Sequence, residues 1–325
     1  MALGEGGSEG QMAKTLNLVK MKNLVTGIGE ALWDMLPEGR KIGGAPANFA
    51  YHVSQFGLEG RVASAVGRDD LGREILDTFR EKGLKCLVET VPYPTGTVSV
   101  TLEGDGIPRY DIKEGAAWDN IPYTPALEAL ASESRAVCFG SLAQRGAVSR
   151  KTIGRFLDAM PDDALKIFDV NLRQNFYSRE LLEDSFMKCN VLKINDEELE
   201  VVGGLLGLSG DGRGGAATDY AEDGAEERCR ELRERFGIRM LILTCGVNGS
   251  HVFGPDGVSS LATPKVEVAD TVGAGDSFTA AFVSGMLKGL DMAEAHRLAV
   301  EVSAYVCTQS GAMPLLPQSL VSRLR

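Results

Sequence analysis

The segment Asp270–Phe278, with the sequence DTVGAGDSF, combines small residues with a carboxylate at the start of an apolar helical pattern. Small residues at positions 273–275 let the backbone approach a ligand closely, and the helix that follows directs N–H groups and its positive dipole end at that ligand. Such an arrangement suits a phosphoryl group during transfer. Asp276 could take the proton of an attacking hydroxyl. The alternative is a glycine-rich turn in which Asp276 only caps the helix.

A second glycine-rich segment, Gly43–Asn48 with the sequence GGAPAN, also precedes a helical pattern. Two glycines before Pro46 allow the backbone to contact a polar ligand, and the Asn48 amide can both donate and accept hydrogen bonds. The same pattern is common in ordinary loop-to-helix turns, so this segment alone does not decide between the two.

Polar residues follow two of the expected strands. Asn195 and Glu198 lie three residues apart at a helix start, where they could hold Mg²⁺ through water or phosphate oxygens, or could merely cap the helix with solvated carboxylates. Arg173 follows another strand and could bind phosphate or form a surface ion pair. In a parallel sheet the ligand crevice lies beyond the carboxyl ends of the strands, where both groups would be.

Short apolar runs alternate with helical patterns along most of the chain. This alternation predicts an α/β fold with a mostly parallel central sheet and helices on both faces. The expected strands are 24–27, 61–66, 136–139, 166–169, 191–194 and 240–244.

Two stretches break this rhythm, at about residues 31–43 and 86–115. In the second, Val98, Val100 and Leu102 alternate with polar residues, which is typical of a half-exposed sheet. We expect both stretches to form a small β lid inserted in a single domain of residues 23–317, after an N-terminal extension of residues 1–22. A glycine-rich stretch at 203–218 is expected to be a solvent loop, so its formal dinucleotide-binding pattern at 210–215 is a chance match.

Composition excludes several classes of protein. The net charge of −11 argues against nonspecific nucleic-acid binding. No apolar run reaches the roughly 18 residues of a membrane span. The six cysteines form no Cys-x-x-Cys pair, which favours reduced thiols in a cytoplasmic protein. Neither a P-loop nor a Gly-x-Ser-x-Gly hydrolase elbow is present.

The two glycine-rich segments together resemble the signatures of the ribokinase-like (PfkB) carbohydrate kinase family. Gly43–Gly67 resembles the N-terminal signature and Asp270–Phe278 the C-terminal one, in the same order, and the resemblance covers residues 23–317. It implies a parallel sheet flanked by helices, a β lid over the sugar, and ATP with Mg²⁺ as cofactors. Many members pair through an exposed lid, so it also implies a homodimer.

The resemblance assigns roles to residues that match the family's motifs. For catalysis it implies Asp276 as the base, with an anion hole formed by the amides of Gly273, Ala274 and Gly275. For the sugar it implies contacts from Asp34, Gly44 and Asn48, and we add Arg173 as a group that stabilises the transferring phosphoryl.

The remaining roles concern the nucleotide and the cations. The residues that match the nucleotide site are Asn195, Thr244, Gly246 and Gly249. Glu198 completes an Asn-x-x-Glu element linked to Mg²⁺, while Asp270 and the Val272 carbonyl match a monovalent-cation site that K⁺ fills in many members.

Within the family, the chain is most similar to fructokinases in Gly29-Glu30, Phe139–Leu142 and Asp169–Arg173. We therefore expect fructose as the substrate. Ribose-specific members tend to have an acidic residue where Ala143 stands. A 2-keto-3-deoxygluconate kinase, which would share Asn171 and Arg173, remains an alternative, as do a nucleoside or phosphosugar kinase and a non-catalytic member that only binds sugar or nucleotide.

Overall fold

The computed structural model describes residues 24–36, 39–102, 108–209 and 224–324 of the chain. Its main sheet has nine strands in the order β13-β12-β11-β10-β9-β8-β1-β4-β5, parallel except for the pairs that involve β12 and β13. The strands are β1 (Leu24–Ile28), β4 (Glu59–Gly67), β5 (Lys85–Val91), β8 (Ala136–Gly140), β9 (Leu165–Asp169), β10 (Val191–Asn195), β11 (Met240–Thr244), β12 (Ser250–Gly254) and β13 (Gly257–Leu261).

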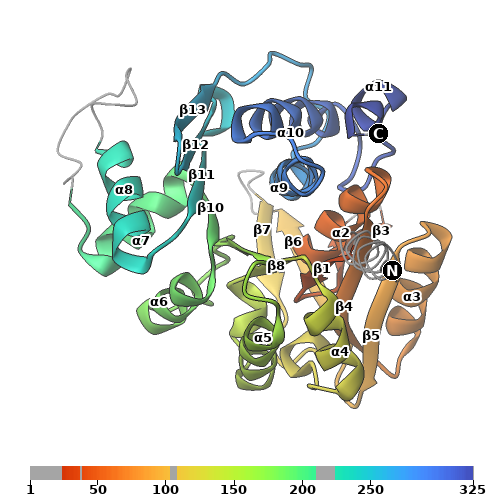
Figure 1. Cartoon of the computed structure of the whole chain (residues 1–325). Helices are drawn as coiled ribbons and strands as arrows, with labels where there is room; N and C mark the ends of the chain where they lie inside the picture. The colour runs from red at the N-terminus through yellow and green to blue at the C-terminus, as the bar shows by residue number, and fades with distance from the viewer. Residues whose placement is uncertain (1–23, 37–38, 103–107, 210–223, 325) are drawn as a thin grey trace, which may run out of the picture.

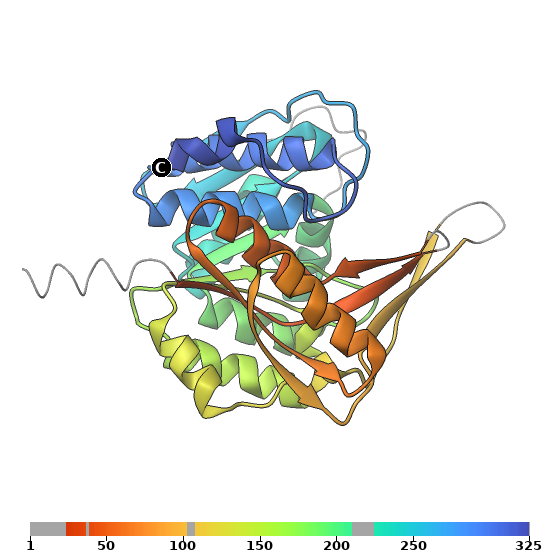
Figure 2. The ribbon, with the colours of Figure 1, turned by 90° about the vertical axis from the view of Figure 1, so that its right-hand side faces the viewer.

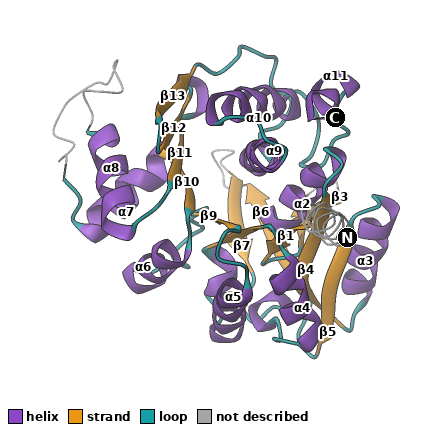
Figure 3. Ribbon diagram, viewed as in Figure 1, coloured by secondary structure: helices purple, strands orange, loops and turns teal. Residues whose placement is uncertain are grey.

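Helices cover both faces of this sheet (Figures 1 and 3). Strand β1, with the sequence LVTGI, is buried at every position because both of its faces are covered. One face carries α2 (Ala45–Gln55), α3 (Asp70–Glu81), α9 (Ala274–Leu287), α10 (Met292–Cys307) and α11 (Gln318–Val321). The other carries α4 (Pro125–Glu133), α5 (Ala147–Ala159), α6 (Arg179–Lys188), α7 (Asp196–Leu206) and α8 (Ala225–Phe236). The expected parallel sheet between two helical layers is confirmed.

A second, four-stranded sheet projects from this body (Figure 2). Its order is β3-β2-β6-β7, and its strands are β2 (Leu32–Leu36), β3 (Gly39–Gly43), β6 (Gly96–Leu102) and β7 (Pro108–Ile112). We call it the lid sheet. Its strands come from both stretches that were predicted to form the lid. The predicted start of the second stretch, residue 86, is wrong, because β5 pairs with β4 in the main sheet. As an edge strand β5 exposes part of its surface, so its mixed pattern resembles that of a lid strand.

The expected loop at 203–218 is wrong in its first residues. Helix α7 continues to Leu206, and Gly207 ends it in the left-handed conformation with φ 65°. The dinucleotide-like pattern at 210–215 lies outside the described residues. In the part of the chain that the structure describes, no helix is long and apolar enough to cross a membrane.

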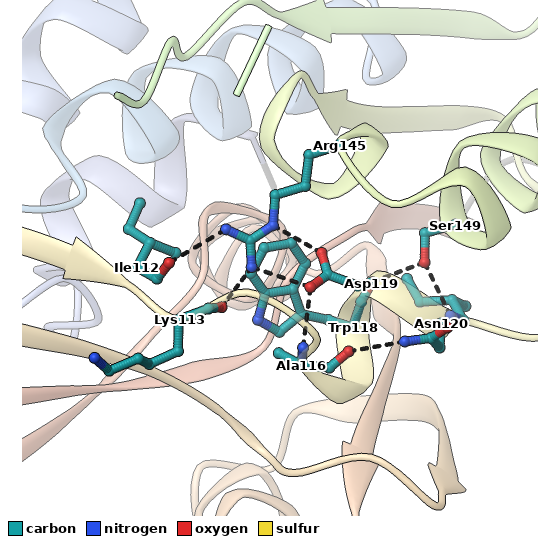
Figure 4. A network of polar contacts seen from close by, with 9 residues as sticks. Ile112, Lys113, Ala116, Trp118, Asp119, Asn120, Arg145 and Ser149 are labelled. Carbon is teal, nitrogen blue, oxygen red and sulfur yellow. Dashed lines mark hydrogen bonds and ion pairs between the residues drawn. The ribbon is translucent and has the colours of Figure 1, made fainter. Parts of the chain in front are cut away.

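A buried arginine joins the lid sheet to the body (Figure 4). The Arg145 guanidinium donates to Asp119 Oδ1 at 2.8 Å and Oδ2 at 3.1 Å, and lies over the Trp118 ring, 4.1 Å from its centroid. It also donates to the carbonyls of Ile112, at 3.4 Å, and Lys113, at 2.5 Å. Ile112 ends β7, so one guanidinium fixes the point where the lid sheet returns to the body.

Replacing Arg145 with Met should lower the free energy of unfolding by about 3–5 kcal/mol, because it leaves the buried Asp119 carboxylate without its cation. The side chains of this pair are only 7% and 8% exposed. Urea denaturation measures the change. The matched control is Arg135→Met, which breaks an ion pair at 2.7 Å whose Asp163 side chain is 70% exposed. We expect that control to cost at most about 1 kcal/mol, and equal losses would contradict the argument.

Candidate active site

Polar side chains gather where the parallel strands β1, β8, β9, β10 and β11 end, at one edge of the main sheet. Glu30 follows β1, Asp169 ends β9, and Asn195 and Thr244 end β10 and β11. This edge is the place where ligands bind in parallel α/β sheets. The sequence therefore brings the predicted site residues to one region through the sheet topology.

A hydrogen bond joins the two glycine-rich segments across this edge. The Asn48 side chain, on α2, donates through Nδ2 to Asp276 Oδ2 at 2.7 Å, although the residues lie 228 positions apart. Asp276 lies in the first turn of α9, whose N-cap is Gly273 and not Asp276. The alternative in which Asp276 only caps the helix is therefore wrong.

The surroundings of Asp276 tune its basicity. Burial raises the pKa of its carboxyl group from an ordinary 3.8 to about 6, and the Asp169 charge adds to this rise, while the Asn48 hydrogen bond and the charges of Lys193 and Arg173 oppose it. The group is ionised at neutral pH and yet basic enough to accept a proton, which is what a general base requires.

A buried lysine lies beneath the glycine segment. Lys193 Nζ donates to Asp169 Oδ1 at 3.1 Å, with both side chains almost fully buried. A methyl group placed on Gly275 would lie 3.1 Å from this Nζ, so the ammonium is directly adjacent to the start of α9. Burial acts to lower the pKa of Lys193, but Asp169 and Glu198 raise it, and the net shift is upward. Lys193 therefore stays charged.

The role of Lys193 was not predicted, although the sequence of β10 contains a signal for it. An interior strand of a parallel sheet is normally apolar throughout, and β10 reads VLKIN. A lysine in the middle of such a strand has to be paired or functional.

The predicted anion hole is only partly formed. Gly273 has φ 78°, and a methyl group there would lie 2.7 Å from the Ala312 Cβ, so both conformation and space require glycine. The Ala274 amide, however, donates to the Thr271 carbonyl at 3.2 Å. A bound phosphoryl oxygen would have to replace Thr271 as the partner of that amide, so the anion-hole role of Gly273, Ala274 and Gly275 stays a prediction.

Asn195 and Glu198 form a reciprocal capping box at the start of α7. Asn195 Oδ1 accepts from the Glu198 amide at 2.7 Å, and Glu198 Oε2 accepts from the Asn195 amide at 3.0 Å. Glu198 Oε1 accepts from the Leu172 amide at 2.9 Å. The Glu198 side chain is buried, which raises its pKa, so the expectation of solvated capping carboxylates is wrong for this residue.

The side chains of Asn195 and Glu198 fit Mg²⁺ only as partners that contact it through water or phosphate, and not as direct ligands. No group of three or more His, Cys, Asp or Glu side chains within the described ranges could hold a metal ion. Both Glu198 oxygens already accept backbone amides, so contact through water or through nucleotide phosphates is what remains. Mg²⁺ commonly keeps several waters and binds through few carboxylates plus substrate phosphates, which agrees with this arrangement.

The predicted sugar-binding residues come from lid strand β2, the start of α2 and the loop after β9. Burial raises the pKa of Asp34, on β2, while the charges of Arg173 and Lys41 lower it. The same Arg173 charge lowers the pKa of Glu30 and of Asp276, so it acts electrostatically on all three carboxyl groups. Gly44, with φ 120°, is the N-cap of α2.

The predicted nucleotide loop follows β11. Thr244 ends that strand, Gly246 begins a short 3-10 helix, and Gly249 has φ 107°. A methyl group on Gly249 would lie 2.5 Å from the Leu261 carbonyl oxygen. The Val247 side chain between them is 88% exposed, which leaves this surface open to a ligand.

The predicted monovalent-cation site lies in the segment before α9. Asp270 Oδ1 accepts from the Val272 amide at 3.0 Å and Oδ2 from the Gly311 amide at 3.0 Å. Lys41 Nζ, on lid strand β3, lies 4.0 Å from Asp270 Oδ2. An ammonium group already approaches this carboxylate, and the K⁺ role of Asp270 and Val272 stays a prediction.

Known proteins resemble this chain over most of its length. A family model described as pfkB family carbohydrate kinase matches residues 38–319. The ATP-dependent 6-phosphofructokinase of Thermoanaerobacterium thermosaccharolyticum is 27% identical and covers 89% of both chains, and a fructokinase of Klebsiella pneumoniae is 27% identical over 89% of this chain and 95% of its own. A solved sugar kinase from Pyrococcus horikoshii in complex with ATP is 25% identical, with a TM-score of 0.72 over 89% of this chain and 94% of that chain.

The chain belongs to the pfkB family of carbohydrate kinases. The expectation of an ATP-dependent sugar phosphotransferase with a ribokinase-like fold is confirmed. The relatives differ in the sugar that their names give, so the family alone does not identify the substrate.

Because folding raises the pKa of Asp276, its ionised carboxylate destabilises the folded protein at neutral pH. Folding shifts its pKa upward from 3.8 to about 6, so stability falls as the pH rises from about 3.8 to about 6 and the loss is complete above that pH. Asp276→Asn removes this loss and should raise the free energy of unfolding by about 1–2 kcal/mol at pH 8, after allowance for partial exposure, with no gain near pH 4. Urea titrations at the two pH values measure the difference.

A carboxylate with the opposite shift provides the control. The Arg135 hydrogen bond lowers the pKa of Asp163, so Asp163→Asn should lower stability at neutral pH and not raise it. A destabilised Asp276→Asn at pH 8 would contradict the assignment of a strained, basic carboxylate.

Proposed function

We propose that this kinase phosphorylates a hydroxyl group of a neutral sugar, with fructose as the first candidate, ATP as the donor and Asp276 as the general base. The observation that carries the proposal is the Asp276 carboxylate, held at 2.7 Å by Asn48 at the start of α9, with a pKa of about 6. The site thus joins a carboxylate of raised pKa to a helix N-terminus that can receive a phosphoryl group.

In the proposed reaction the sugar hydroxyl oxygen forms a bond to the γ-phosphorus of ATP in line, the bond from this phosphorus to the β–γ bridging oxygen breaks so that ADP leaves, and the hydroxyl proton moves to Asp276. The start of α9, Arg173 and the Lys193 ammonium stabilise negative charge on the transferring group. Asn195 and Glu198 would hold Mg²⁺ only through water or the nucleotide phosphates, and the ion would supply further charge neutralisation. Closure of the lid sheet would exclude water, which competes with the sugar as an acceptor.

The charges around the pocket favour a neutral acceptor. Asp34 and Asp276 provide carboxyl groups, which can accept hydrogen bonds from sugar hydroxyls and repel an anionic substrate. A phosphosugar would need cations in the lid sheet. Among the described side chains there, Arg40 pairs with Glu74 and Lys113 pairs with Asp111, and Lys41 Nζ lies 4.0 Å from Asp270 Oδ2, so each of these three cations already has a carboxylate beside it.

Fructose is favoured over other neutral sugars by two observations. The Klebsiella pneumoniae relative is a fructokinase, and several plant relatives have the same name. Ala143, buried beside Gly29, stands where ribose-specific members tend to have an acidic residue. A 2-keto-3-deoxygluconate kinase is the second candidate, because the exposed Arg173 could pair with the carboxylate of that sugar acid.

The remaining proposals concern cofactors and assembly. We propose Mg²⁺ as the metal that accompanies ATP, and K⁺ near Asp270 as an activator. The lid sheet has edge strands β3 and β7, through which a second copy could pair to form a homodimer. The six cysteines are free thiols, four of them buried, which supports a reducing compartment such as the cytoplasm.

A substrate panel tests the choice of sugar. With ATP and Mg²⁺, turnover should be highest on fructose among fructose, ribose, 2-keto-3-deoxygluconate, fructose 6-phosphate and adenosine. A preference for the keto acid would leave the mechanism unchanged and would indicate that Arg173 pairs with the carboxylate of that substrate. A preference for fructose 6-phosphate would contradict the electrostatic argument for a neutral acceptor.

Removal of the base tests the mechanism. Asp276→Asn keeps the size of the side chain and should lower kcat about 10²–10⁴-fold, as expected for loss of a general base. In the unaltered enzyme, activity should rise as the pH rises through about 6, because Asp276 must be ionised to accept the proton. Near-normal turnover by a folded Asp276→Asn enzyme would disprove this role.

A further inference from the structure

Glu30 is a buried acidic residue that the proposed reaction does not use. It lies directly after β1, and its side chain is only 4% exposed. Its Oε1 accepts from the amide of Ala45, the first residue of α2, at 3.2 Å. The N-cap of that helix, Gly44, provides no side chain, and its first turn contains no acidic residue. Glu30 thus supplies from outside the helix the acceptor that a capping side chain normally provides.

Two buried oxygen atoms near the start of α2 lack a donor. Glu30 Oε2 and Asn48 Oδ1 have no hydrogen-bond partner among the described residues. Asn48 lies one turn after Ala45, and helical side chains lean toward the helix N-terminus, which is the end that Glu30 caps. Each buried acceptor left without a donor costs about 1–3 kcal/mol, so two of them on residues that both lie at the N-terminal end of α2 call for an explanation.

A single proton removes both deficits. An ionised carboxylate can only accept hydrogen bonds, whereas a carboxylic acid also donates one. If Glu30 Oε2 carries the proton, it becomes a donor and Asn48 Oδ1 is the acceptor that needs one. No second proton has to be transferred, and the Asn48 Nδ2 group keeps its hydrogen bond to Asp276.

We propose that Glu30 is a positioning residue of the active site that donates an O–H hydrogen bond to Asn48 Oδ1 and so fixes the orientation of the Asn48 amide toward Asp276. The proposal rests on the roles proposed above for Asn48 and Asp276. A flipped amide would place an oxygen against the Asp276 carboxylate, which would repel it. The chain Glu30–Asn48–Asp276 therefore connects the end of β1 to the base through α2.

The charges that face Glu30 support its protonated state. Burial raises its pKa to about 7, and the Asp276 charge from α9 adds to the rise. The amides of Glu30 and Ala45 oppose it, as does the Arg173 charge from the loop after β9. On β8 the Cys138 thiol has a pKa raised well above its ordinary value, first by burial, and stays neutral. As the pH rises through about 7, Glu30 ionises, loses its proton and can no longer donate to Asn48.

Two substitutions separate this role from that of a simple acidic cap. Glu30→Gln supplies a permanent N–H donor, so its kcat/KM should not show the decline that the unaltered enzyme shows above about pH 7. Glu30→Ala supplies no donor and should lower kcat/KM about 10–100-fold at every pH, as displacement of a catalytic group does. The control is Glu294→Gln, where a glutamate oxygen accepts the Asp291 amide at the start of α10, also at 3.2 Å, in an exposed position. Its pH profile should equal that of the unaltered enzyme.

An infrared difference spectrum between the unaltered enzyme and Glu30→Gln reads the proton directly. It should show a carboxylic-acid C=O band that disappears above about pH 7. This band needs neither sugar nor ATP, so it tests Glu30 even if none of the five substrates is turned over. Absence of the band, or a Glu30→Gln enzyme as impaired as Glu30→Ala, would overturn the proposal.

Discussion

The ion pair between Lys193 and Asp169 places charge inside the sheet, and the electrostatics of the site depend on it. Burying two charges is expensive, and such a pair seldom adds net stability. Its effect here is on a neighbour, because the Asp169 charge raises the pKa of Asp276 and the Lys193 charge lowers it. The basicity of Asp276 is thus a balance between opposite charges on two adjacent strands, each fixed by the hydrogen bonds of the sheet.

The site contains more carboxyl groups than cations. Its cations include Lys193 and Arg173, and its carboxyl groups are those of Asp34, Glu30, Asp169, Glu198 and Asp276. The pKa is raised to about 7 in Glu30 and to about 6 in Asp276. Such an environment binds hydroxyl groups well and polyphosphate poorly. The nucleotide therefore has to bring its own counter-ion and to rely on backbone amides. This explains why glycine segments, and not clusters of basic side chains, line the region where phosphate would bind.

The fold could be predicted from the sequence, and so could the position of Asp276, the proposed base, at the start of α9, because both depend on local patterns. Apolar runs identify the interior strands, and the DTVGAGDSF segment identifies the start of α9. The assignment of β5 failed because the periodicity of an edge strand resembles that of a lid strand. The roles of Lys193 and Glu30 could not be predicted, since each depends on partners that only the assembled sheet brings together. Even within the DTVGAGDSF segment, the hydrogen bond from the Ala274 amide to the Thr271 carbonyl could not be predicted from the sequence pattern.

The bond from Asn48 to Asp276 spans 228 positions, and this span governs when a newly made chain can become active. During synthesis the N-terminal half, with β1, α2 and β4, leaves the ribosome long before α9 exists. Until α9 packs against α2, the proposed base Asp276 is absent from its place beside Asn48. On the proposed role of Asp276, a nascent or truncated chain that ends before α9 would lack its base and would not consume ATP.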